Sequence, residues 1–210
     1  MRNILLAIML VVCLAAAAAA QNSNKYEVFG GFSLSSYDTG FGGRVVGADD
    51  RETAPGFEAS GAGYFTNHLG IEGDFDGHFK SKTFTFPSTL VADEKLQSFN
   101  FLGGPHYRFS PRGKLTFFTR ALIGANHSSL TNGSFTTAGG LLVPGTGGSE
   151  TDFAMKLGGG LDVGWTKRTA FRLGFDYNPI FQPKDGSLNP DFGSRRTRND
   201  VLFNVGLVFK

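Results

Sequence analysis

The chain has 210 residues, which is enough for one domain and tight for two. Its formal net charge is +2, and it becomes +1 if Arg2 is removed with the N-terminal segment described below, which excludes a strongly basic nucleic-acid binder. The sequence contains 30 glycines and 22 phenylalanines, and it has no long apolar run besides the one near its N-terminus. Because phenylalanine is costly to expose to water, this composition favours a structure that hides aromatic side chains against something other than its own core.

The first 20 residues are predicted to be a secretory signal peptide. Arg2 precedes an apolar run over 4–14, and the small residues 15–20 provide an Ala-x-Ala cleavage pattern. The run is too short for a typical transmembrane helix. The single cysteine, Cys13, lies within this segment, so the mature chain is expected to have no thiol and no disulfide. We therefore expect a signal peptide over 1–20 and one domain over 21–210.

The rest of the chain is predicted to form strands, because apolar and polar residues alternate along successive segments. In chain order, strands are expected at about 25–35, 56–66, 69–80, 96–109, 114–127, 152–165, 169–180 and 199–210. Most have about 10–14 residues, enough to cross a bilayer at a tilt. IEGDFDGHF (71–79) shows the pattern, with acids and a histidine at every second position. Pro105 cannot donate to a strand ladder, which predicts a local bulge.

Short and long connections alternate between these strands. The tight ones are 67–68, 110–113 and 167–168, and the long ones are about 36–55, 81–95, 128–151 and 181–198. This layout is typical of an outer-membrane barrel with short periplasmic turns and longer extracellular loops, and it would place both termini in the periplasm. The predicted fold class is therefore all-β, an eight-stranded antiparallel transmembrane up-and-down barrel. Aromatic residues beside the tight turns are expected to form an interfacial girdle: Tyr64, Phe65, Tyr107, Phe109 and Trp165.

Two stretches carry a resemblance to a known family: FNFLGGPHYRFSPRGKLTFFTRALIGANH (99–127) and FAMKLGGGLDVGWTKRTAFRLGFDYNP (153–179). They resemble the outer-membrane β-barrel domain family of small OmpA-like and OmpX-like proteins, and the resemblance covers essentially the whole mature chain. It implies the barrel fold and an outer-membrane location more strongly than a function. The closing strand 199–210 resembles the signal that the barrel-assembly machinery reads, so this machinery is an expected partner. Because the chain ends at Lys210, we do not expect the peptidoglycan-binding domain of longer OmpA-type proteins.

The polar face of the strands is expected to fill the barrel interior. Eight strands leave room for little more than side chains, and a buried charge is costly without a partner. We therefore expect a paired network of inward residues that closes the barrel: Glu27, Glu72, Asp74, Asp76, His78, Arg108, Arg120, Lys156, Asp162, Arg172 and Asp176. The alternative for Asp74, Asp76 and His78 is a metal site, since residues on one face lie about 6–7 Å apart. The leading expectation is no metal and no cofactor.

Two motifs near the predicted loops suggest further sites. His127 and Ser129, with Glu150, resemble the arrangement in outer-membrane lipid A deacylases, where the serine would be the nucleophile, the histidine the base and the glutamate its orienter. The competing interpretation is a polar strand end that enters a loop. Arg195, Arg196 and Arg198 lie at the predicted outer rim, where they would contact lipopolysaccharide phosphates or form a solvated cluster.

These observations predict an outer-membrane protein that is not an enzyme. Its role would be structural, or would lie in surface interactions through the four long loops with an extracellular partner that the sequence does not name. Outer-membrane lipid and lipopolysaccharide are expected to surround it, and nucleic acid is not an expected partner. The two alternatives are a narrow porin-like channel and a lipid A-modifying enzyme.

Overall fold

The structure is a computed structural model that describes residues 25–38, 51–85, 91–109, 114–132, 135–136, 142–143, 147–186, 188 and 196–210. For residues 82–85, 91–94, 132, 135–136 and 142–143 only the backbone is described. The predicted signal peptide (1–20) lies outside the described residues, as does the tight connection 110–113.

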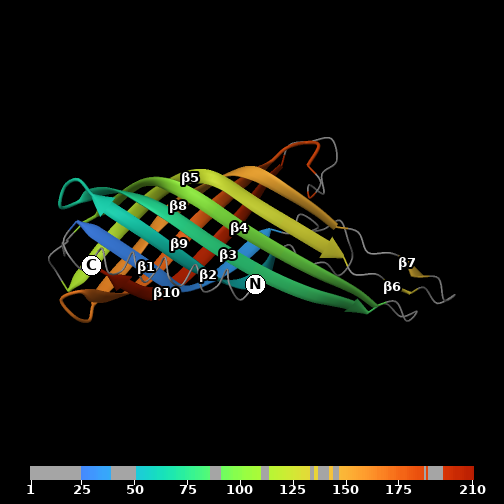
Figure 1. The fold of residues 1–210 in the computed structure, drawn as a ribbon, viewed down its shortest axis with the longest axis horizontal. Coiled ribbons are helices and arrows are strands. Elements are labelled where there is room, and N and C mark those ends of the chain that lie inside the picture. The colour runs from blue at the N-terminus through green and yellow to red at the C-terminus, as the bar shows by residue number, and fades with distance from the viewer. Residues whose placement is uncertain are drawn as a thin grey trace, which may run out of the picture.

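Eight long strands close into a barrel (Figure 1). They are β1 (Tyr26–Asp38), β2 (Arg51–Tyr64), β3 (Leu69–Thr85), β4 (Val91–Arg108), β5 (Leu115–Asn132), β8 (Gly147–Gly164), β9 (Thr169–Gln182) and β10 (Arg196–Phe209). All neighbours are antiparallel, and the pairing of β1 with β10 closes the sheet. The predicted eight-stranded all-β barrel is therefore confirmed. Among the described residues, no helix is long and apolar enough to cross a membrane.

The barrel has two different ends. One end carries the tight turns 65–68 and 165–168 and the C-terminus, and we call it the turn end. The opposite end, which we call the loop end, carries a short hairpin of β6 (Phe135–Thr136) and β7 (Leu142–Val143) in the connection between β5 and β8 (Figure 1).

Several strands continue further toward the loop end than the alternation predicts. β3 and β4 stay paired as far as Thr85 and Val91, and β5 pairs with β8 as far as Thr131 and Gly147. The predicted loops 81–95 and 128–151 are thus partly strand. Where both faces of a strand are polar, apolar and polar residues no longer alternate in the sequence, although the backbone hydrogen bonds between the strands can continue.

The bulge predicted at Pro105 is wrong. The register of β4 with β5 is the same on both sides of it, with Gly103 opposite Ile123 and His106 opposite Arg120, so no residue is inserted. Pro105 pairs with Ile71 on β3, and only the ladder toward β5 is interrupted beside it. The strand therefore accommodates proline on the side where no backbone donor is used.

The two faces of the wall have opposite chemistry. Large apolar side chains point outward and stay exposed, among them Phe101, Phe117, Phe153, Phe175 and Phe203. The inward positions carry most of the buried charged and amide side chains. Because this inverts the arrangement of a water-soluble protein, the outer face needs an apolar surrounding.

Four of the five residues predicted for the aromatic girdle are exposed at the turn end. Phe65 and Trp165 are 74% and 67% exposed, and Tyr107 and Phe109 are also exposed. Tyr64 is an exception, because it points inward and is only 6% exposed. It precedes Phe65 by one residue, so it lies on the opposite face of the strand.

Candidate functional site

The interior of the barrel is the candidate site, and its lowest level lies at the turn end. Glu27 accepts hydrogen bonds from Arg108 Nη1 and from the Tyr64 hydroxyl, both at 2.8 Å. Arg172 forms an ion pair with Asp162, with 2.7 Å between Nε and Oδ1. The guanidinium of Arg108 also stacks on the Tyr64 ring, 3.7 Å from its centroid. Charges and an aromatic ring therefore fill this end together.

Arg120 organises the middle level from β5. Its Nη1 lies 2.8 Å from Glu58 Oε1 and 2.9 Å from Glu72 Oε1. Its Nη2 donates to Asp176 Oδ2 at 2.6 Å, while Nε donates to Oδ1 of the same carboxylate at 2.9 Å. The two bonds to Asp176 make the bidentate pair that a planar guanidinium suits best. One arginine thus joins strands β2, β3 and β9 across the barrel.

Lys156 on β8 is the second cation of the middle level. It is fully buried, donates to Asp74, and lies 2.6 Å from Asp76 Oδ2. Glu58 lies further away, with 3.8 Å between Oε2 and the ammonium nitrogen. A lysine without solvent can stay charged only with such partners.

At this level, carboxylates outnumber the arginine and lysine side chains. The five acids in contact with Arg120 and Lys156 are Glu58, Glu72, Asp74, Asp76 and Asp176. Two histidines also contact these acids, since His106 Nδ1 contacts Glu72 and His78 Nδ1 lies 3.2 Å from Asp76 Oδ1. The middle of the barrel is therefore acidic, and each cation serves several acids.

All of the predicted interior residues lie buried inside the barrel. The turn-end level brings together Glu27, Arg108, Asp162 and Arg172, and the middle level brings together Glu72, Asp74, Asp76, His78, Arg120, Lys156 and Asp176. Sequence reasoning left out Glu58 and His106, although strand alternation gives both an inward position. It also left out Tyr64, whose aromatic ring suggested the girdle.

The metal alternative for Asp74, Asp76 and His78 is not supported. The carboxylates of Asp74 and Asp76 are held by Lys156, and His78 Nε2 lies 2.9 Å from Ser33 Oγ. In the part of the chain that the structure describes, no group of three or more His, Cys, Asp or Glu side chains is arranged to hold a metal ion.

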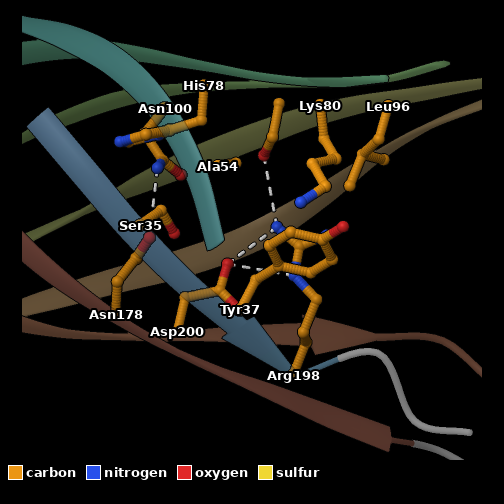
Figure 2. Close-up of a pocket in the computed structure, with 11 residues that line it drawn as sticks. Ser35, Tyr37, Ala54, His78, Lys80, Leu96, Asn100, Asn178, Arg198 and Asp200 are labelled. Carbon is orange, nitrogen blue, oxygen red and sulfur yellow. Dashed lines mark hydrogen bonds and ion pairs between the residues drawn. The ribbon is translucent and has the colours of Figure 1, made fainter. Parts of the chain in front are cut away.

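Arg198 closes the loop end. Its Nε donates to Asp200 Oδ2 at 3.1 Å, and Nη1 and Nη2 donate to Ser128 Oγ and Ser98 Oγ, each at 3.2 Å. Figure 2 shows Arg198 and Asp200 at a small cavity that Lys80 also lines. The cavity leaves about 10 Å³ of free space, enough for about one water molecule. Little free space is therefore left beside Arg198 at the mouth of the barrel.

The predicted rim cluster of arginines needs correction. Arg198 is only 7% exposed because its position on β10 points inward, so it is not available to lipopolysaccharide. Arg196 forms an ion pair with Asp38 at 2.8 Å. Arg195 lies outside the described residues.

The predicted deacylase-like triad is not assembled. Glu150 pairs with Ser128 across β5 and β8, whereas His127 pairs with Thr151 and Ser129 with Ser149. Because strand side chains alternate between faces, Glu150 lies on the inner face and the other two residues lie on the outer face. His127 Nδ1 instead contacts Thr151 Oγ1 at 2.8 Å.

Comparisons with known proteins agree with this architecture. The sequence model of the outer membrane protein beta-barrel domain matches residues 4–209. Among solved structures, Ail, the attachment invasion locus protein of Yersinia pestis, is similar with 16% identity and a TM-score of 0.51, over 88% of this chain and 97% of that one. Neisserial surface protein A is similar with 12% identity and a TM-score of 0.51, over 88% and 96%.

The curated proteins contain no match. The family match nevertheless extends over nearly the whole chain, and the closed barrel with its apolar outer face is the structure that this family requires. The chain belongs to the outer membrane protein beta-barrel domain family and is a bacterial outer-membrane barrel.

Proposed function

We propose that this protein is a closed barrel that works through its loop end, as a structural or surface-interaction protein, and that it has no enzymatic activity. The observation that carries the proposal is the interior itself. Arg198 spans the mouth, and Arg120 and Lys156 fill the level beneath it with their carboxylate partners. Solutes then have no path through the barrel, so contact with the surroundings falls to the loop end and the outer wall.

The interior can be tested by conductance in a planar bilayer. The refolded full chain is expected to give no discrete current steps, and Arg198→Ala is expected to stay silent because the middle level remains filled. Arg196→Ala is a matched control, since its partner Asp38 lies on β1 at the loop end. Circular dichroism would confirm a folded sheet in each sample. Discrete steps from the unaltered protein would contradict the proposal and favour the porin-like alternative.

Sulfated polysaccharide is the ligand class that we propose for the loop end. The similar Ail structure contains sucrose octasulfate, a heparin analogue. This chain places exposed cations at its loop end, with Arg51 at the start of β2 and Lys184 just after β9. Sulfate groups pair with such cations by charge, and salt screens that attraction.

A heparin column can test this ligand class with matched charges. We expect the full chain in detergent to bind the column and to elute with salt. Replacing Arg51 and Lys184 by serine should lower the salt needed for elution. Replacing Lys167 and Arg168, two exposed cations at the turn end, removes the same charge and should leave elution unchanged. Equal losses in the two variants would mean that net charge alone drives retention.

We also propose two contacts with the cell envelope. Lipopolysaccharide would contact the outer wall and the rim but not the buried Arg198. The barrel-assembly machinery would bind the closing strand β10. A pull-down of the assembly machinery with and without residues 199–210 would test the second contact.

A further inference from the structure

Three buried oxygen atoms gather at the loop end on β8 and β9. Within the described part of the chain, Glu150 Oε1, Asp152 Oδ1 and Gln182 Oε1 have no hydrogen-bond partner. Asp152 and Gln182 are buried, with 5% and 3% of their surface exposed. All three atoms are acceptors, so none of them can satisfy another without a proton or a cation between them.

The three side chains share one small region of the inner wall. Glu150 and Asp152 are two residues apart on β8, where they pair with Ser128 and Asn126, so both lie on the inner face as neighbours. Phe153 pairs with Phe181, so the next position along each strand places Gln182 opposite Asp152. Opposed residues on one face have Cβ atoms about 4.5–5.5 Å apart, which lets the amide oxygen reach the carboxylates.

Neither nearby arginine supplies the missing donor. Arg196, which pairs with Gln182 across β9 and β10, forms its ion pair with Asp38. The charge of Arg198 acts on Asp152, but its hydrogen bonds go to Asp200, Ser98 and Ser128. Two adjacent carboxylates repel each other when both are charged, and a buried acceptor without a partner is unfavourable. A bound cation would remove both penalties.

We propose that Glu150, Asp152 and Gln182 form a calcium-binding site at the loop end of the barrel. Carboxylate and amide oxygens are the ligands that hard divalent cations prefer, and the site offers neither sulfur nor imidazole for zinc. Calcium accepts irregular sets of six to eight oxygens, so water and backbone carbonyls can complete its shell. Magnesium demands near-ideal octahedral geometry and is the poorer fit. Glu150 is half-buried, which leaves the site a route to solvent.

The site also holds the chain that follows β9. Glu150 Oε2 accepts a hydrogen bond from the Leu188 backbone nitrogen at 2.9 Å. The backbone at Gly186 also lies against the same carboxylate, because a Cβ atom added there would fall 2.2 Å from Glu150 Oε1. A cation bound by Glu150 would therefore link β8, β9 and the segment that leads to β10.

Calorimetric titration of the full chain in detergent micelles with calcium chloride tests the site. We expect one saturable site with a dissociation constant of about 10⁻⁴–10⁻³ M, and a higher midpoint of thermal unfolding in calcium than in EDTA. Asp152→Asn should weaken binding at least about tenfold, because it removes one of the two charged ligands. Asp185→Asn is the matched control, since Asp185 is an exposed acid in the adjoining segment, and it should bind calcium as the unaltered chain does.

A charge-replacement variant separates binding from folding. Gln182→Lys places an ammonium group between the carboxylates, so we expect a raised unfolding midpoint in EDTA and no further rise with calcium. Three results would overturn the proposal: no saturable binding up to about 10 mM calcium, equal binding by Asp152→Asn, or equally tight binding of magnesium. In the first case, a proton shared between the two carboxylates would be the better account.

Discussion

Replacing Lys156 by methionine tests whether the interior depends on its ion pairs. Lys156 is fully buried and holds Asp74 and Asp76 directly, with Glu58 at 3.8 Å. Methionine keeps much of the volume but removes the charge, so several carboxylates remain buried with one cation fewer. Removing one partner of a buried ion pair costs about 3–5 kcal/mol. We expect a loss of that size in the free energy of unfolding.

Equilibrium unfolding in urea with lipid vesicles measures this loss. Trp165 is the only tryptophan in the sequence and lies exposed at the turn end, so its fluorescence reports whether the barrel is inserted. Lys80→Met is the matched control. The Lys80 side chain is 30% exposed and lies 3.9 Å from Glu52, so its loss should cost at most about 1 kcal/mol.

A second substitution distinguishes lost pairing from lost packing. In the Lys156→Met background, Asp74→Asn removes one of the uncompensated charges and should restore about 1–3 kcal/mol. Packing damage would not be repaired by this change. If Lys156→Met costs no more than Lys80→Met, water must solvate the interior carboxylates, and the reasoning from a filled barrel fails.

Three further substitutions probe the wall and the turn end, each followed by the same urea titration. Gly160→Ala should destabilise the barrel by about 1–3 kcal/mol, because its Cβ would collide with the Leu173 carbonyl oxygen, whereas Gly73→Ala enters open space and should be tolerated. Phe101→Lys on the outer face should cost about 2–4 kcal/mol if it lies near the bilayer midplane, and a smaller loss would place it near an interface. Tyr64→Phe removes the hydroxyl that donates to a buried carboxylate and should cost about 1.5–3 kcal/mol, while an unchanged midpoint would show that ring stacking on arginine suffices.

Strand alternation allowed much of the fold to be predicted from the sequence. In IEGDFDGHF the period of two separates Phe75 from Asp74 and Asp76, and the structure places these side chains on opposite faces of β3. The same rule applies to every strand that crosses an apolar region, because lipid outside and side chains inside demand different residues. This requirement appears in the sequence as alternating apolar and polar residues.

The partners of each side chain could not be predicted in this way. Arg120 joins Glu58, Glu72 and Asp176 from three strands, and these contacts depend on the register and closure of the whole barrel. Arg198 shows the same difficulty at a strand end. The adjacent arginines in the sequence suggested an exposed cluster. Because β10 begins as early as Arg196, however, the side chain of Arg198 points into the mouth of the barrel.

The deacylase-like motif failed for a related reason. The resemblance to lipid A deacylases made Glu150 a candidate partner of His127 and Ser129, and the register does bring them to adjacent strands. The pairing of Glu150 with Ser128, however, places it on the other side of the wall. The strand was expected to start only at about 152. Because β8 starts at Gly147, the alternation that turns Phe153 outward also turns Glu150 inward.

The length of the strands has a consequence for how the loop end meets its surroundings. On β3 and β4 the ladder continues to Thr85 and Val91, well past Phe79 and Phe99, which are among the last aromatic residues of the outer face. Paired strands hold their backbone in fixed register, whereas an unpaired loop must be ordered when it binds. A partner that bound the proposed loop-end surface would therefore meet a rim that is partly ordered before contact, so less conformational entropy would oppose binding. The same rim carries the carboxylates of Glu150 and Asp152, where a bound calcium ion would add a further restraint.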